Sequence, residues 1–137
     1  MNKQDFQTYT RAFSSCDYEG YSRFYTEDVV LELGSVGEIK GRQGIVDFYR
    51  QMNRSVREVL TIHQVIVDEG GIAADLSMEF QAIDDAPDFV LGAMKKGESI
   101  KGGVLVFYTL RDGKISRIRT ARSKELEGPA AMAGAAA

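Results

Sequence analysis

The sequence predicts an α+β domain in which a curved antiparallel sheet wraps around N-terminal helices to form a cone-shaped α+β barrel. Apolar residues recur at helical spacing in much of the chain up to Met52, whereas from Leu60 onward their period changes to two. The pair Asp112-Gly113 stands between two runs of β-forming residues, which is a strong signal for a hairpin. Helices that precede a set of antiparallel strands pack together on one face of the sheet.

The first helix is expected over residues 3–16. Apolar side chains recur there every three or four residues and so form one face of a helix. That face carries Phe6, Tyr9, Phe13 and Cys16. Since Tyr9 belongs to it, we expect the Tyr9 ring to point into the domain.

Two more helices and one strand are expected before residue 60. Asp17 can cap a short helix over 18–25, because its side chain can accept a hydrogen bond from the first turn. Residues 29–33 are rich in β-branched and apolar side chains and predict a strand. After Gly41 the apolar residues return to helical spacing up to Met52, which predicts the third helix.

Four antiparallel strands are expected next, over 60–67, 72–81, 104–110 and 115–121. The strand over 104–110 is apolar on both faces, so we expect something to cover each face. The connection 84–103 is long for a hairpin and contains five glycine and proline residues. A connection of this length suggests a functional flap.

Length and composition favour one intracellular domain. At 137 residues the chain can bury a core, and we expect one domain over 1–127 followed by a loose tail of small residues over 128–137. The single cysteine, Cys16, excludes an internal disulfide, and no zinc-binding spacing occurs, so no metal is expected. No phosphate loop, dinucleotide-binding glycine motif or nucleophile elbow occurs, so no cofactor is implied. No secretory leader and no membrane-spanning apolar run are apparent, which predicts a cytoplasmic location. A net charge of −3 disfavours nucleic acid and acidic membranes as partners.

Three short motifs point to a known family. They are Tyr25-Thr26-Glu27-Asp28-Val29, Gly41-Arg42-Gln43-Gly44-Ile45 and Arg111-Asp112-Gly113-Lys114-Ile115. Through them the chain, over residues 6–124, resembles the SnoaL-like branch of the nuclear-transport-factor-two-like (cystatin-like cone) superfamily. The resemblance implies the cone fold but no single activity. The superfamily includes ketosteroid isomerases, epoxide hydrolases, polyketide cyclases, dehydratases and non-catalytic binding modules.

The resemblance also implies where related enzymes would keep their active-site residues. The oxyanion tyrosine of ketosteroid isomerases falls on Tyr9, but their base falls on Leu33 and their protonated acid on Leu105. The last-strand aspartate of limonene epoxide hydrolases falls on Thr120. Without a base, isomerisation of ketosteroids at an enzymatic rate is not expected. A slip of one residue within the strands would turn Asp75 from the outer to the inner face.

Tyr9 and His63 are the candidate catalytic residues. His63 is the only histidine, the residue type that titrates nearest neutrality, and it shares a strand face with Val65 and Val67. It can serve as an acid or base in a pocket, or it can be a half-buried strand residue that bonds a neighbour. Tyr9 can equally be an oxyanion donor or a core tyrosine whose hydroxyl reaches water or a carbonyl.

An apolar pocket with few polar groups is expected inside the cone. Its expected lining comprises Phe13, Tyr25, Leu33, Tyr49, Leu76, Leu105, Ile118, Thr120 and Arg122. Arg122 has the alternation parity of Ile118 and Thr120, so it can hold an anionic group at the mouth, or it can simply extend from a strand end into water. Asp75 and Glu79 alternate with apolar residues and are expected on the outer face.

Two functions remain open. One is a small enzyme, an isomerase, cyclase, dehydratase or hydrolase, that acts on a small apolar molecule with one hydrogen-bond acceptor. The other is a non-catalytic ligand-binding or dimeric assembly module of the same fold. A homodimer is also expected, built through the outer face of the sheet, where Asp75 and Arg119 provide opposite charges.

Overall fold

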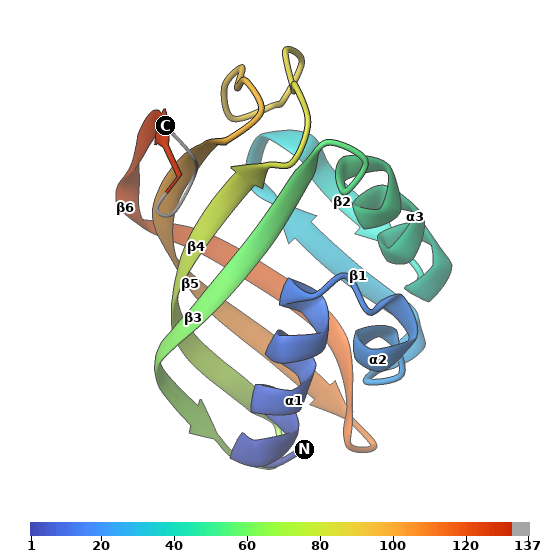
Figure 1. Ribbon diagram of the computed structural model, residues 1–137. Helices are drawn as coiled ribbons and strands as arrows, with labels where there is room; N and C mark the ends of the chain where they lie inside the picture. Colours follow the sequence, from blue (N-terminus) through green and yellow to red (C-terminus); the bar gives the residue numbers. More distant parts are fainter. Residues whose placement is uncertain (133–137) are drawn as a thin grey trace.

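A strongly curved sheet of six strands wraps around the first helix in the computed structural model, which describes residues 1–132 (Figure 1). The strands are ordered β2-β1-β6-β5-β4-β3. Neighbouring strands are antiparallel except β1 and β6, which are parallel. The expected cone-shaped α+β fold is confirmed, with the differences that the sheet is mixed and that it stays open, because β2 and β3 lie at its two edges.

The helices are α1 (Lys3–Ser14), α2 (Tyr18–Ser22) and α3 (Arg42–Met52). α1 begins with a capping box, in which Asp5 N donates to the Asn2 side chain over 2.8 Å and Asn2 N donates to the Asp5 carboxylate over 2.9 Å. The helix ends before Cys16, whose φ of 60° places it in the left-handed region. α1 lies in the hollow of the sheet, whereas α3 packs beside β1 and β2 (Figure 1).

The strands extend beyond the ranges that the apolar pattern predicts. They are β1 (Tyr25–Leu33), β2 (Gly37–Lys40), β3 (Val56–Val67), β4 (Gly71–Ala82), β5 (Glu98–Arg111) and β6 (Lys114–Ala131), with a 3-10 turn over Gly34–Val36. β2 has a single apolar side chain, Ile39, so alternation does not reveal it. Residues 25–28 belong to β1 and not to the end of the second helix or a break, because Tyr25 pairs with Ile115 of β6.

The Asp112-Gly113 hairpin is confirmed by the pairing of Arg111 with Lys114. Both turn residues have positive φ, 53° and 77°, which is the backbone that a tight hairpin between twisted strands needs. The long connection between β4 and β5 projects beyond the end of the sheet (Figure 1). It is closed on itself by a bridge between Ala86 and Met94.

The C-terminal segment is more ordered than its composition suggests. Residues 128–131 belong to β6, where Ser99 pairs with Ala130 and Glu98 with Ala131. The expectation of a loose tail over 128–137 is therefore wrong for 128–131, because main-chain hydrogen bonds to β5 replace the side-chain burial that alanine and glycine cannot provide. The remainder of that tail, 133–137, lies outside the described residues.

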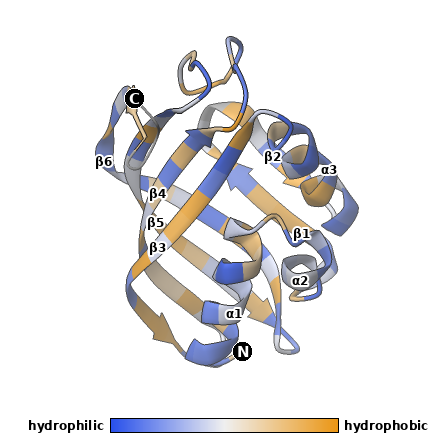
Figure 2. Ribbon diagram, viewed as in Figure 1, coloured by the Kyte–Doolittle hydropathy of each residue, from blue (hydrophilic) through white to orange (hydrophobic). Residues whose placement is uncertain are grey.

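The core lies between α1 and the concave face of the sheet. Phe6 is fully buried and packs edge-on against Tyr108 with 5.2 Å between ring centroids. Tyr9 is 3% exposed, as its place on the apolar face of α1 predicts. Figure 2 shows hydrophobic and hydrophilic bands along β3. More and less exposed residues alternate over much of this strand, consistent with one face toward the helix and one toward solvent.

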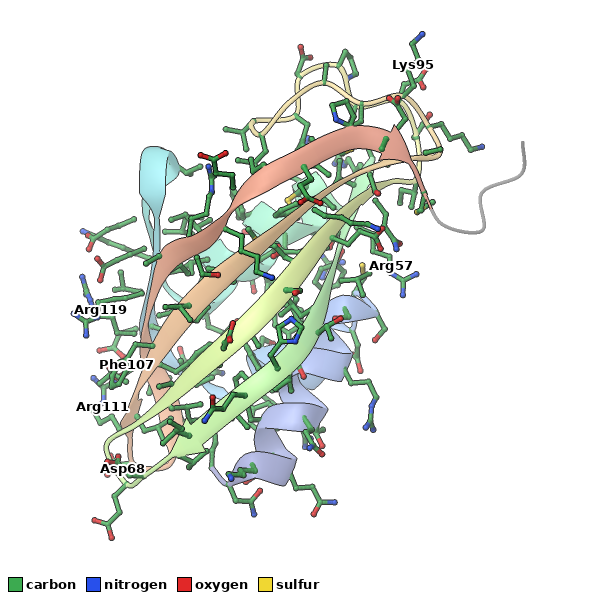
Figure 3. The ribbon with its side chains drawn as sticks, turned by 90° about the vertical axis from the view of Figure 1, so that its left-hand side faces the viewer. Arg57, Asp68, Lys95, Phe107, Arg111 and Arg119 are labelled. Carbon is green, nitrogen blue, oxygen red and sulfur yellow. The ribbon has the colours of Figure 1, made fainter. Side chains whose placement is uncertain are left out.

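The outer face of the sheet carries apolar side chains that nothing in the described chain covers. On β5, Val104, Val106 and Tyr108 are buried, but Leu105 is 51% and Phe107 40% exposed. The expectation that both faces of this strand are covered therefore holds within this chain for the inner face of β5 only. Figure 3 views the sheet from this side and shows Phe107 close to Arg119 of β6.

We predict that Phe6→Ala lowers the free energy of unfolding by about 3–5 kcal/mol, because it leaves a cavity between α1 and β5. Urea denaturation followed by circular dichroism measures the change. Gln7→Ala, on the exposed side of the same helix, is the control and should change stability by less than about 0.5 kcal/mol. Equal losses in the two variants would contradict this account of the core.

Candidate active site

A cavity of about 390 Å³ opens between the helices and the concave face of the sheet. This volume is in the range of small-molecule sites. Its wall is mainly aromatic and aliphatic, with Tyr9 and Phe13 from α1 on one side and Leu76 and Val104 from the sheet on the other. Residues 89–91 of the connection between β4 and β5 also line it, so this connection lies where a flap was expected.

Two tyrosine hydroxyls meet inside the cavity. The oxygens of Tyr9 and Tyr25 are 2.8 Å apart, and either can be the donor. Both side chains are buried, and burial is the main reason that the pKa of each phenol lies well above its usual range. The pair therefore stays protonated. One hydroxyl donates its proton to the other in this hydrogen bond. The second hydroxyl can therefore donate its own proton in a hydrogen bond to a ligand.

Glu58 of β3 is the only carboxyl side chain in the lining that the structure describes. Burial raises its pKa from 4.5 to about 7. Burial is the main reason that the pKa values of Tyr9, Tyr49 and Tyr108 are raised, and the negative charge of ionised Glu58 raises them further. A carboxyl with this pKa is well suited to take up and release protons near neutral pH.

The sequence pattern misses Glu58 because the expected strand begins at residue 60. β3 in fact begins at Val56, and its inward residues are Val56, Glu58, Leu60 and Ile62. Extending the alternation of Leu60 and Ile62 backward would have placed Glu58 inside the cone. The residues that the apolar pattern places inside the cone include no carboxyl, and the structure adds Glu58 to them.

The structure brings together most of the residues expected to line the pocket. The cavity wall includes Tyr9, Phe13, Tyr25, Leu33, Tyr49, Leu76, Ile118, Thr120 and Arg122. Thr120 is engaged, since its hydroxyl donates to the Glu32 carbonyl over 3.2 Å. Arg122 is exposed beyond it on β6, which places its guanidinium at the mouth.

His63 does not reach the cavity. The pairing of β3 with β4 passes from Ile62–Leu76 to Gln64–Asp75, so His63 is the extra residue of a bulge. The bulge reverses the alternation, and the parity that His63 shares with Val65 no longer indicates a shared face. His63 is exposed on the outer face, where its Nε2 bonds the Ser77 hydroxyl.

Leu105 is also outside the cavity. It lies on the outer face opposite Asp75, and the inward positions on either side of it are Val104 and Val106. Leu105 therefore does not occupy the position of an inward acid, and neither of its inward neighbours is acidic. Asp75 is on the outer face, as its alternation predicts.

Neither a metal site nor a membrane-spanning helix is found in residues 1–132. No three His, Cys, Asp or Glu side chains in that range are grouped as a metal site would need. No helix in that range is long and apolar enough to cross a membrane.

Solved structures similar to this chain include three enzymes or candidate enzymes. A candidate polyketide cyclase from Xanthomonas campestris has 25% identity and a TM-score of 0.72, with 85% of this chain and 86% of that chain covered. A candidate polyketide cyclase from Pseudomonas putida has 24% identity and a TM-score of 0.73, with 85% and 87% covered. An LEH-like epoxide hydrolase from Mycobacterium tuberculosis has 15% identity and a TM-score of 0.70, with 88% and 80% covered.

Sequence comparison identifies the family. No curated protein gives a significant match. A family model described as a SnoaL-like domain matches residues 6–118, the part of the chain that contains most of α1 and most of the sheet. Since this match spans most of the chain, the protein belongs to the SnoaL-like domain family.

Proposed function

We propose that this protein is a small enzyme of the isomerase or cyclase type that acts on an apolar molecule with a carbonyl group. Glu58 moves the proton, and the Tyr9–Tyr25 pair binds the carbonyl oxygen. The observation that carries the proposal is that a lone carboxyl and a hydroxyl pair line the same apolar cavity. The candidate polyketide cyclase with 25% identity supports the same reaction class.

The proposed chemistry begins with the carbonyl oxygen of the ligand. This oxygen accepts a hydrogen bond from the free hydroxyl of the Tyr9–Tyr25 pair, while the Glu58 carboxylate removes a proton from the neighbouring carbon. The resulting enolate is stabilised by the phenol that donates to its oxygen. In isomerisation, Glu58 returns the proton to another carbon. In cyclisation, the enolate carbon forms a bond to a second carbonyl carbon, and the new alkoxide takes the proton from Glu58.

A non-catalytic, dimeric module is the second candidate function, and the outer face of the sheet favours it. Ile66 is 60% exposed and lies near Leu105 and Phe107, with Asp75 and Arg119 in the same shallow groove. A second copy of the chain, related by a twofold axis, would cover these apolar side chains and present charges of both signs. We therefore propose a homodimer through this face, which is compatible with either function.

Glu58→Gln is expected to slow proton transfer by about 10²–10⁴-fold. The measurement is deuterium exchange at the carbon beside the carbonyl of 2-tetralone, followed by NMR with the uncatalysed rate subtracted. In the wild type the rate should rise as pH passes through about 7 and then level off, because the carboxylate form of Glu58 is the base. The control is Glu79→Gln on the outer face, which should exchange at the wild-type rate. Binding of 2-tetralone without any catalysed exchange would favour the binding module.

Glu58 should also make the fold less stable at alkaline pH. Because folding raises its pKa from 4.5 to about 7, stability is highest while the group is neutral and falls as pH rises between these values. We predict that Glu58→Gln is about 1–3 kcal/mol more stable than the wild type at pH 8, and that the difference shrinks toward zero at pH 4. Urea denaturation at the two pH values measures this. A difference that does not vary with pH would contradict burial of the ionised group.

Leu105→Lys is expected to convert the homodimer into a 15.1 kDa monomer, because it places a charge in the centre of the outer face. Sedimentation velocity at micromolar concentration measures the state of association. Val90→Lys, an exposed apolar residue in the connection between β4 and β5, is the control and should remain dimeric. A wild-type protein that sediments as a monomer would rule out the proposed dimer.

A further inference from the structure

We propose that the ligand of this cavity is an apolar acid, whose carboxylate binds Arg122 at the mouth while its neutral carbonyl end reaches Tyr9 and Tyr25. The inference rests on the proposed function, because it concerns the same cavity, and it adds the chemical class and the orientation of the ligand. Four observations support it.

The first observation is that the cavity has only two charged side chains in its described lining, Glu58 and Arg122, and that these do not pair. No ion pair joins them within 4 Å among residues 1–132. No cation opposes the effect of burial on the pKa of Glu58. The two residues come from β3 and β6, and because β4 and β5 lie between these strands, three interstrand spacings, about 14 Å, separate β3 from β6 across the sheet.

The second observation is that the other arginines of the β5–β6 hairpin already have partners. Arg111 pairs with Asp28, and Arg117 pairs with Glu32 at 2.6 Å and Glu38 at 2.7 Å. Arg119 lies over the Phe107 ring. Within residues 1–132, Arg122 has no hydrogen-bond acceptor or ion-pair partner. Its guanidinium is therefore available to bind a carboxylate through two hydrogen bonds.

The third observation is the position of Arg122. It pairs with Val104, whose side chain lines the cavity, and it follows Ile118 and Thr120 along the same inward side of β6. Since Arg122 is exposed and also lines the cavity, it lies at the rim of the apolar wall. An anion placed there keeps contact with water, so the cost of desolvating it is small.

The fourth observation fixes the orientation of the ligand. A carboxylate deep in the cavity would be desolvated and would be repelled by ionised Glu58. A neutral carbonyl at that depth instead accepts the free proton of the Tyr9–Tyr25 pair. The acidic end of the molecule is therefore outermost and the reacting end innermost, with the apolar body against the wall between them.

The test compares a tetralone carboxylic acid with its methyl ester, which differs mainly in charge. At low salt, isothermal titration calorimetry should show that the acid binds about 3–10-fold more tightly than the ester. This preference should disappear in Arg122→Gln and be partly retained in Arg122→Lys. It should persist in Arg119→Gln, the control on the opposite face of the same strand, and it should weaken at about 0.5 M salt.

The outcomes separate this inference from the proposed function. Equal binding of acid and ester, or a preference that survives in Arg122→Gln, would overturn the inference while the proposed function stands. Failure of both compounds to bind would overturn both. An ester that binds and undergoes Glu58-dependent deuterium exchange, together with an acid that binds no better, would confine the error to the role of Arg122.

Discussion

The cavity exists because α1 does not cover the whole length of β3, the strand on which it packs. The Ser14 hydroxyl at the end of the helix accepts a hydrogen bond from Leu60 N over 3.0 Å, and β3 extends four residues beyond that point to Val56. Along this uncovered length the concave face has no helix to fill it, and Glu58 lies there. Tyr9 sits one to two turns before the end of α1, so its hydroxyl is held at the boundary between packed core and open cavity. The same helix therefore closes the core and supplies the site.

The fold could be predicted from the sequence because it is specified by local patterns that agree with one another. The apolar face of α1 and the Asp112-Gly113 turn each depend on a few neighbouring residues, and both are present in the structure. Long-range effects were not accessible in the same way. The bulge at His63 is a property of the pairing of β3 with β4. It places Val65 and Val67 on the inner face while His63 stays outside, so the parity that these residues share in the sequence is misleading. The ordering of residues 128–131 likewise comes from main-chain pairing with β5, which side-chain composition does not predict.

The candidate site was only partly accessible, for a related physical reason. Its apolar wall follows from alternation, which is why most of the expected lining residues are found there. Glu58 conflicts with that logic, because a carboxyl is an unfavourable choice for an inward strand position and is ordinarily read as solvent-facing. A polar residue at a buried position of an otherwise apolar pattern indicates function, because its burial lowers stability and contributes nothing to the fold itself.

The edge strand β3 has a consequence for how molecules of this protein meet one another. A twelve-residue edge offers a row of unpaired backbone groups that could template further strands and seed fibrils. Here the Ser14 hydroxyl occupies the Leu60 amide, α1 shields the adjoining stretch, and the bulge at His63 breaks the regular spacing of the remainder. Backbone pairing between copies along this edge is thereby obstructed, and the proposed homodimer would instead use side-chain contacts on the outer face.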